Sequence, residues 1–383
     1  MYPTYVPILK AKKGEFTALK KLKATYSEKI APFFEIPILV RKQKEPKWLV
    51  ESTQPLTDHL QRTAKKLVSS CQSNAFFFDI TQWKADSYIE TGEHVLSYLH
   101  RELSKSGAII HPVVGFDRWD ILDYQIALKN LNIPDVTNYC IRIDSSSIID
   151  DSYDVDYFTG TLEKIIEDLG LSSKEVMIML DFDDITNRSI ESLNDHVKHV
   201  LNILSDYEFS CIIISGGSFP AFINKAVKDE NSSDYVTRRE IHVWKSFVDD
   251  STLPLIFSDY GIRNPKAKDD IIAPNANGKI RYTIEDKFFV VRGYAKNKDE
   301  EYKQLHGLSE ILVKSPHYLG PEFSWGDECI LACSKKEILG GNTEWVSHDT
   351  NHHISYVVEE ITEFNRIRAA KKQQPYNKKN HAH

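Results

Sequence analysis

The sequence contains no uninterrupted apolar run of about 18 residues, which is the length that a membrane-spanning helix needs. We therefore expect no association with a membrane. The N-terminus also lacks the charged segment and long apolar stretch of a signal peptide, and it is more typical of the start of a β-strand. With 41% hydrophobic and 27% charged residues, the 383-residue chain has the composition of an ordinary soluble protein.

Paired cysteines and a strong net charge are missing too. The five cysteines are odd in number and include no CxxC pair, so we expect reduced thiols in a cytoplasmic protein. A formal net charge of -7 argues against a nucleic-acid surface over the whole chain, and leaves nucleic acid as a weakly supported partner through a local basic patch. The C-terminal lysines are more typical of a solvated tail than of a nucleic-acid arm: Lys371, Lys372, Lys378 and Lys379.

Two motifs with known chemistry are absent as well. No Gly-x-Gly-x-x-Gly follows an early strand, which argues against a Rossmann domain. Ser215 does not stand in a Gly-x-Ser-x-Gly elbow, so a serine hydrolase of that kind is not expected.

The chain does contain a series of short apolar runs that end in polar or charged residues. The run Val176–Asp184 breaks into three carboxylates, and its length predicts a strand buried on both faces. Similar runs recur along the chain, separated by segments with helical spacing of apolar residues: Tyr5–Lys10, Phe33–Ile36, Phe76–Ile80, Ala108–Gly115, Tyr139–Ile143, Cys211–Ser215 and Pro254–Tyr260.

Eight strand–helix units in this order predict an α/β fold, a (β/α)8 TIM-like barrel, whose usual length is about 250 residues. A doubly wound open sheet is the alternative. Residues 1–320 are assigned to the barrel, with an extra β-hairpin near 278–292, and a helix at 302–313 is a candidate for the delayed eighth barrel helix. Residues 321–368 are assigned to a C-terminal helical and irregular segment packed on the barrel, and 369–383 to a basic, disordered tail.

In a barrel the C-terminal strand ends converge on one face, where active sites lie. The polar residues that end these strands therefore predict an acidic pocket for acid–base chemistry, or for binding a divalent metal through oxygen ligands. The alternative is that the acids are helix caps and loop residues. The candidate catalytic residues are Glu35, Asp181, Asp183 and Asp259, and the candidate substrate-binding residues are Lys10, Lys12, Asp79, Arg142, Ser215, Gly216 and Tyr260.

Three of these positions carry sharper expectations. Arg142 lies inside a strand, where an unpaired charge would be very costly, so we expect it to pair with Asp79 or Asp181. We expect one of Asp181 and Asp183 to face the barrel axis and the other to serve the following turn. Ser215 and Gly216 follow the seventh strand, where barrels often bind phosphate through backbone N–H groups.

The C-terminal segment is rich in Gly, Trp and His. His348 and His352 have the spacing of two imidazoles on one helix face, as in zinc sites, but the accompanying Glu of His-Glu-x-x-His is absent. Thr350 is expected to cap a final helix from about Ile354 to Arg368, which would leave His348 outside it. We instead expect Trp325, Trp345 and His352 to pack this segment over the barrel mouth.

Several segments resemble the phage beta-protein family, over residues 2–360. The resemblance is carried by Tyr5–Glu15, Pro32–Pro37, Phe78-Asp79, Phe323–Asp327 and Trp345–His353. Members occur in phages and bacteria, and the resemblance implies a barrel-like fold and a setting in phage–host conflict. It implies neither a reaction nor a catalytic set, so the candidate site residues follow from the sequence pattern alone.

Two main hypotheses result. The protein is a metal-dependent hydrolase of a nucleotide or nucleic-acid phosphate, or a non-enzymatic recognition or scaffold subunit that binds a phage protein or a partner effector. Replacing Asp181 or Asp259 by Asn is expected to inactivate an enzyme that stays folded, whereas surface changes around Ile280–Val291 are expected to disable a recognition subunit. A structural phage protein is a third, weaker hypothesis.

Overall fold

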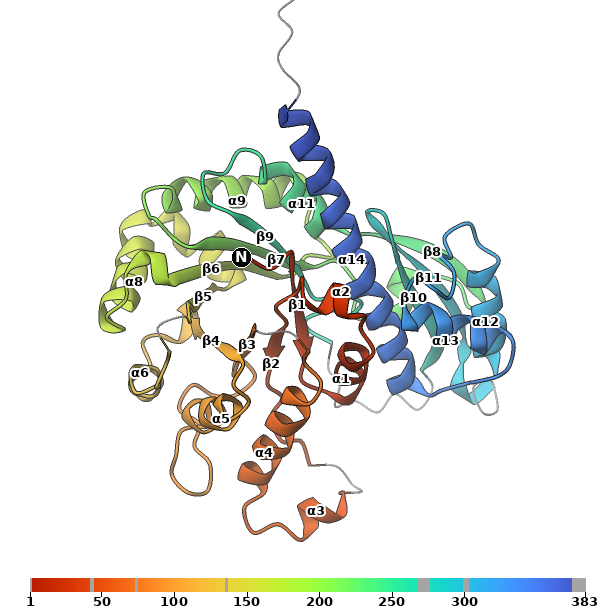
Figure 1. Ribbon diagram of the computed structural model, residues 1–383, viewed down its shortest axis with the longest axis horizontal. Helices are drawn as coiled ribbons and strands as arrows, with labels where there is room; N and C mark the ends of the chain where they lie inside the picture. The colour runs from red at the N-terminus through yellow and green to blue at the C-terminus, as the bar shows by residue number, and fades with distance from the viewer. Residues whose placement is uncertain are drawn as a thin grey trace, which may run out of the picture.

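A computed structural model describes residues 2–41, 45–72, 75–134, 137–267, 276–298 and 303–373. Eight parallel strands form a closed barrel (Figure 1), which confirms the predicted TIM-like fold. In barrel order they are β1 (Tyr5–Lys10), β2 (Phe33–Glu35), β3 (Ala75–Asp79), β4 (Ile109–Gly115), β5 (Tyr139–Ile143), β6 (Val176–Asp184), β7 (Cys211–Gly217) and β9 (Leu255–Asp259). The barrel closes where β9 pairs with β1, with Tyr5 beside Phe257.

The strands are apolar on both faces because each lies between two cores. Alternate side chains point inward and fill the barrel, among them Phe33, Phe77 and Met179. The side chains between them, such as Phe34 and Phe257, pack outward against the helices. Because side chains alternate between the two faces of a strand, every second residue at a strand end points into the barrel.

Helices surround the barrel on its outside. They are α1 (Lys13–Lys20), α2 (Ala24–Ser27), α3 (Lys47–Val50), α4 (Pro55–Val68), α5 (Val95–Ser104), α6 (Leu122–Lys129), α7 (Ser145–Ile149), α8 (Val155–Asp168), α9 (Ile190–Leu204) and α11 (Arg239–Phe247). The short helix α10 (Ile223–Ala226) packs instead against a second sheet. Short 3-10 turns lie at Phe116–Arg118, Asp151–Tyr153, Ser173–Glu175 and Lys296–Lys298.

The final helix, α14 (Asn342–Gln373), completes the ring. It packs against α1 and β1, and its Phe364 contacts Trp244 of α11. It thus takes the place of the eighth barrel helix, between the last strand and the first. The assignment of 302–313 to that place is wrong, because α12 (Gln304–Val313) packs on the second sheet.

A second lobe lies beside the barrel (Figure 1). It contains an antiparallel sheet in the order β10 (Asn277–Ile284), β11 (Lys287–Ala295), β8 (Ser232–Thr237), with α12 and α13 (Trp325–Ser334) on one face. The hairpin of β10 and β11 confirms the prediction. The strand β8 was not expected, because its sequence Ser-Ser-Asp-Tyr-Val-Thr has little apolar character and much of it is exposed.

Helix α14 begins earlier than its sequence suggests. Thr350 is not its cap, and His348 lies inside it, because the polar residues 347–353 are buried between the barrel and the second lobe. A helix is normally recognised by apolar residues that recur on its buried face. Here polar residues occupy the buried positions, so that pattern is absent from the start of α14. The helix also continues to Gln373, so residues 369–373 of the predicted tail are helical, while 374–383 lie outside the described residues.

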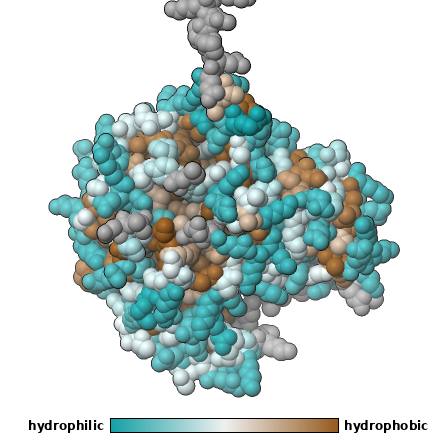
Figure 2. Space-filling view, in the orientation of Figure 1, coloured by the Kyte–Doolittle hydropathy of each residue, from teal (hydrophilic) through white to brown (hydrophobic). Residues whose placement is uncertain are grey.

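Two expectations about the whole chain can be compared with the fold. Of the helices in the described residues, none is long and apolar enough to cross a membrane. The four buried cysteines are free thiols: Cys140, Cys211, Cys329 and Cys333. The face seen in Figure 2 is largely hydrophilic, with hydrophobic residues in small separate groups.

Candidate active site at the barrel mouth

A pocket of about 730 Å³ opens at the C-terminal ends of the barrel strands. The ends of β1 to β6 and β9 all contribute side chains to its wall, whereas no described residue of the β7 end does so. Its volume lies within the range of about 300–1,000 Å³ that is usual for small-molecule sites. Of the candidate residues, those that line the pocket are Lys10, Lys12, Glu35, Arg142, Asp181, Asp183 and Tyr260.

The floor of the pocket is built around the guanidinium group of Arg142. Its Nε and Nη2 donate to Asp181 Oδ2 at 2.9 and 2.6 Å, and its Nη1 donates to Asp79 Oδ2 at 2.7 Å. Nη2 also donates to Glu35 Oε1 and to the Tyr260 hydroxyl, both at 2.8 Å. The expected pairing of Arg142 with Asp79 or Asp181 is confirmed, and both acids take part.

A second arginine, Arg118 from the turn after β4, also lines the pocket and binds one acid of the floor. Arg118 Nη1 donates to Asp79 Oδ1 at 2.9 Å, so that Asp79 is fully buried between two guanidinium groups. Burial by itself raises the pKa of Asp79, but Arg118 and Arg142 outweigh it and hold the pKa below its usual value. Asp79 therefore holds two pocket-lining arginines in place and does not itself line the pocket.

This arrangement changes the expected character of the site. Three carboxylates that could have shared a metal surround an arginine instead. Within the described part of the chain, no three or more His, Cys, Asp and Glu side chains are grouped so that they could hold a metal ion. The pocket is lined by equal numbers of basic and acidic side chains, so it is not the acidic pocket that the sequence suggested.

Asp183 is the carboxylate of the wall with the most unusual setting. Its backbone has φ 56°, in the left-handed region that Asp tolerates better than most residues. Burial, and then the neighbouring Asp181, raise the pKa of its carboxyl group, while Lys266 Nζ lies 3.2 Å from its Oδ2. A carboxylate with a raised pKa in a pocket is a candidate for accepting and returning a proton.

The orientations of the β6 acids differ from the expectation. Asp181 and Asp183 both line the pocket, because side chains two residues apart in a strand point to the same side. Asp184 serves the following turn, and its Oδ1 accepts hydrogen bonds from the backbone N–H and the hydroxyl of Thr186. The prediction that Asp181 and Asp183 diverge is wrong.

Lysines form another part of the wall. Lys10, Lys12 and Lys266 line the pocket from the ends of β1 and β9. Lys10 Nζ donates to the carbonyl oxygen of Ala267 at 2.9 Å, and burial lowers the pKa of its ammonium group. These cations could hold an anionic group of a ligand above the floor.

Asp259 lies outside the pocket. Its side chain points to the outer face of the barrel, as does that of Phe257 two residues earlier. There Tyr5 donates a hydrogen bond to it, His353 Nε2 lies 3.2 Å from its carboxylate, and Arg238 lies 3.8 Å away. It joins the barrel to α14, in a junction that we define as Tyr5, Arg238, Glu240, Asp259, His353 and Glu360.

Ser215 and Gly216 do not line the pocket either. The Ser215 side chain is buried. A Cβ on Gly216 would contact Ile185 at 3.0 Å, and one on Gly217 would lie 2.6 Å from Pro265 Cδ. Gly217 allows the segment after β9, which carries Lys266, to pack closely on β7, and Gly216 leaves room for Ile185 after β6.

The aromatic and histidine residues of the C-terminal segment lie away from the mouth. Trp345 is in the core of the second lobe, and His352 stacks on Tyr282 at 3.7 Å and bonds to Asp327 Oδ2 at 2.9 Å. Trp325 contacts His348 at a centroid distance of 5.0 Å. None of them lines the pocket, so the prediction that they cover the mouth is wrong.

Several wall residues were not predicted from the sequence: Asp117, Arg118, Asp150, Arg188 and Lys266. Asp117 and Arg118 directly follow the apolar run of β4, so the rule that strand ends meet at one face could have found them. Arg188 and Lys266 stand several residues beyond their strands. No simple spacing rule identifies such loop positions.

Comparisons with known proteins were made for the whole chain. A family model described as Beta protein matches residues 5–359. The search of curated proteins found no match. Among solved structures, the carboxyl transferase domain of Rhizobium etli pyruvate carboxylase, determined with 3-bromopyruvate, is similar at 9% sequence identity and a TM-score of 0.34. That similarity covers 97% of this chain and 54% of the other, so this chain spans about half the length of the matched chain.

Proposed function

The chain belongs to the Beta protein family, and from that premise we propose that it acts in phage–host conflict by hydrolysing a phosphate-containing nucleotide or nucleic-acid end at the barrel mouth. Its place in such a conflict, as an antiviral protein or a phage-encoded counterpart, is what the family resemblance implies. The chemical part of the proposal depends on the pocket.

One observation supports the chemistry above all others. The same pocket presents three lysines, which suit a phosphate group, and Asp183, whose carboxyl group has a raised pKa. The floor beneath them is fixed by the bonds of Arg142, so that a bound phosphate would meet groups that are already in position.

In the proposed reaction, water attacks the phosphorus atom and its proton passes to the Asp183 carboxylate. The bond from phosphorus to the leaving oxygen breaks, and that oxygen takes a proton from Asp183 or from solvent. Lys10, Lys12 and Lys266 stabilise the negative charge on the phosphoryl oxygens. A divalent cation would be carried in with the phosphates, since the described side chains offer no preformed set of ligands.

The test is a thermal-shift panel followed by an assay. Purified protein is screened with nucleoside mono-, di- and triphosphates, each with and without Mg²⁺ or Mn²⁺, and the hits are assayed for phosphate release. Asp183→Asn is expected to retain the fold and lose about 10²-fold or more of the hydrolysis rate, the usual contribution of a general base. Asp206→Asn, at an exposed position before β7 at the opposite end of the barrel, is the matched control. The absence of any shift with all ligands would refute the proposal.

A recognition subunit is the second candidate, and the edge of the second sheet favours it. Strand β8 pairs with β11 on one side, and Ser233, Asp234 and Tyr235 are exposed. An exposed strand edge can accept an added strand from a phage protein or a partner effector. The substitution Asp234→Pro is expected to abolish such binding in a pull-down, while the pocket still binds nucleotide.

The hairpin is a poorer place to test recognition than the sequence suggested. Ile280, Tyr282 and Val291 are fully buried in the second lobe, so changes there would unfold it. Asp181 and Asp259 are likewise buried in networks of charged partners, and their replacement would alter stability together with any activity. Asp183 is the better residue for separating an enzyme from a binding protein.

A further inference from the structure

We infer that the barrel mouth selects a phosphate ligand whose other end carries N–H donors, as the amino-bearing base of a nucleotide does. The inference rests on the proposed function and adds to it a ligand class. It follows from how the charges are distributed around the wall of the pocket.

The barrel order places the charges on opposite sides. The ring runs β1-β2-β3-β4-β5-β6-β7-β9, so β5 stands four strands from β1, and β4 stands four strands from β9. In an eight-stranded ring, such strands face each other across the axis. Residues that follow β1 and β9 therefore face those that follow β4 and β5.

The β9–β1–β2 side is basic. Among the described residues that line the pocket, this side supplies three lysines and one glutamate: Lys10, Lys12, Lys266 and Glu35. Glu35 accepts a hydrogen bond from Arg142, so the guanidinium group of the floor balances its negative charge. Lys266 is 66% exposed, and a phosphate group is the complementary ligand for the three lysines.

The β3–β6 side is acidic. It supplies three arginines and five aspartates: Arg118, Arg142, Arg188, Asp117, Asp144, Asp150, Asp181 and Asp183. Two of the arginines are held in the floor by buried acids. Asp117, Asp144 and Asp150 follow β4 and β5, the strands opposite β9 and β1, which precede Lys266, Lys10 and Lys12.

The acidic wall is held in place by its own local structure. Asp144 caps α7, accepting hydrogen bonds from the Ser146 backbone N–H at 3.0 Å and from the Ser147 hydroxyl at 2.8 Å. Arg118 Nε donates to Asp117 Oδ1 at 3.2 Å. Ionised carboxylates accept hydrogen bonds and cannot donate them, so this wall favours amino and imino groups and disfavours a second anionic group.

The consequence is a ligand with two unlike ends. A polyphosphate alone would satisfy the lysines and place its remaining charge against Asp117 and Asp150. A nucleotide can place its phosphate on the lysines and the exocyclic amine of its base on the carboxylates. A pocket of about 730 Å³ has room for both parts.

Calorimetric titration with matched probes tests the inference. The probes are inorganic pyrophosphate and two nucleotide pairs that differ by one amino group: AMP with purine riboside 5′-monophosphate, and GMP with IMP. At least one amino nucleotide is expected to bind about tenfold more tightly than its partner, the ratio expected for one hydrogen bond to a charged group.

Two variants assign the preference to the wall. Asp117→Asn combined with Asp150→Asn is expected to bring the ratio within each pair close to one, while pyrophosphate binds as before or more tightly. Lys12→Gln is expected to weaken pyrophosphate and nucleotides alike and to leave the ratio unchanged.

The failures of the two proposals are distinguishable. If pyrophosphate binds to the wild-type protein but the paired nucleotides bind equally, the inference is wrong and a phosphate site remains. If the aspartate variants change the affinity for pyrophosphate and for both nucleotides of a pair by the same factor, the wall acts through its charge alone and the inference is again wrong. If neither pyrophosphate nor any nucleotide binds, the proposed function fails and the inference fails with it.

Discussion

The barrel mouth and the junction with α14 are built from the same kinds of residue, yet only one of them is open. Both contain a strand-end aspartate that accepts a hydrogen bond from a tyrosine and forms an ion pair with an arginine: Asp181 with Tyr260 and Arg142 at the mouth, and Asp259 with Tyr5 and, at 3.8 Å, Arg238 at the junction. The mouth surrounds a space of about 730 Å³, whereas at the junction the side chains are packed against one another.

The difference arises from the direction in which each side chain leaves its strand. Asp181 points to the barrel axis, where loops of several lengths leave a cavity, and Asp259 points outward to a helix that covers it. A small cavity between the two regions, with space for about one water, is lined by Tyr260 on one side and His353 on the other. Residue type at a strand end is therefore a weaker sign of function than the face on which the residue lies.

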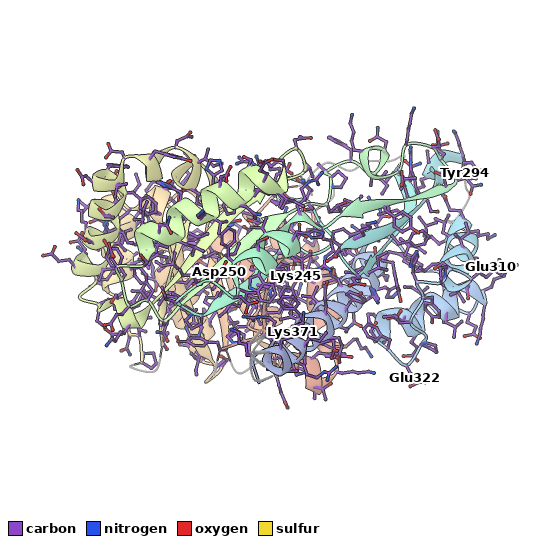
Figure 3. All side chains as sticks on the ribbon, turned by 90° about the horizontal axis from the view of Figure 1, so that it is seen from above. Lys245, Asp250, Tyr294, Glu310, Glu322 and Lys371 are labelled. Atoms are coloured by element: carbon purple, nitrogen blue, oxygen red, sulfur yellow. The ribbon has the colours of Figure 1, made fainter. Side chains whose placement is uncertain are left out.

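The junction also explains how the second lobe is attached. Arg238 Nη1 donates to Glu360 of α14 at 2.7 Å, and Lys245 Nζ bonds to Glu360 at 3.2 Å and to Asp286 of the hairpin at 2.9 Å. Seen from above (Figure 3), Lys245 lies near the middle of the molecule, while Tyr294, Glu310 and Glu322 lie toward the outer end of the second lobe. The junction therefore has a structural role, in contrast to the mouth.

The largest effect is expected from removing the central cation of the mouth. Arg142→Met leaves Glu35, Asp79 and Asp181 buried without their shared partner. We expect a loss of about 3–5 kcal/mol in the free energy of unfolding, the usual cost of an uncompensated buried charge. Urea denaturation of the variant and the wild type measures it.

The matched control is Arg188→Met, another arginine of the same pocket. Arg188 Nη2 donates to the Ser145 hydroxyl at 3.2 Å, and within the described part of the chain Arg188 is not an ion-pair partner of the buried acids of the floor. Its replacement is expected to cost under about 1 kcal/mol. Equal losses in the two variants would show that the floor of the mouth is not the rigid base described above.

The next effect separates the two regions directly. Asp259→Asn removes the charge that faces Arg238 and His353, and we expect it to cost about 2–3 kcal/mol of stability without a specific loss of ligand affinity. Asp183→Asn is expected to change stability little and to lower the hydrolysis rate about 10²-fold or more. Thermal denaturation, nucleotide titration and phosphate release of both variants form the test, and the reverse pattern would exchange the roles of the two aspartates.

The sequence predicts the fold well and the site only in part. Apolar runs ending in charge identify all eight barrel strands, because strands buried on both faces carry a continuous signal. The pairing of Arg142 also follows from the cost of burying a charge. Asp259 was placed in the pocket because its end of β9 meets the other strand ends, but its inward or outward direction depends on register. The buried polar start of α14 and the polar edge strand β8 lack the periodic signal altogether.

A third effect depends on pH and belongs to the junction. Burial, reinforced by Asp259, raises the pKa of Glu240 from 4.5 to about 7, while Arg238 and the hydroxyl of Ser218 act in the opposite direction. The folded state thus favours protonated Glu240. Its contribution to stability is fully present below pH 4.5 and is lost as the pH rises toward 7.

Glu240→Gln, a neutral side chain of the same shape, is expected to remove this dependence. Denaturation between about pH 5 and pH 8 should show a wild-type stability that falls by roughly 1–2 kcal/mol relative to the variant. Burial also lowers the pKa of His348 to about 4, but that group is present in both proteins and cancels in the difference. Parallel curves for the two proteins would show that Glu240 is ionised throughout this range.

The smallest effect on stability is expected from Lys266→Gln, and this makes it the most specific probe of the mouth. Lys266 is 66% exposed and pairs with Asp183, which is 33% exposed, so water screens the pair and its loss should cost at most about 0.5 kcal/mol. The affinity for pyrophosphate should still fall, and with it the dependence of binding on salt, because a lysine that binds phosphate acts through long-range charge. Lys287→Gln, in the second lobe, is the control of equal charge at an exposed position. Replacing a junction residue should instead change stability strongly and leave the affinity for pyrophosphate unchanged. Measuring stability and affinity together therefore assigns a residue to the mouth or to the junction.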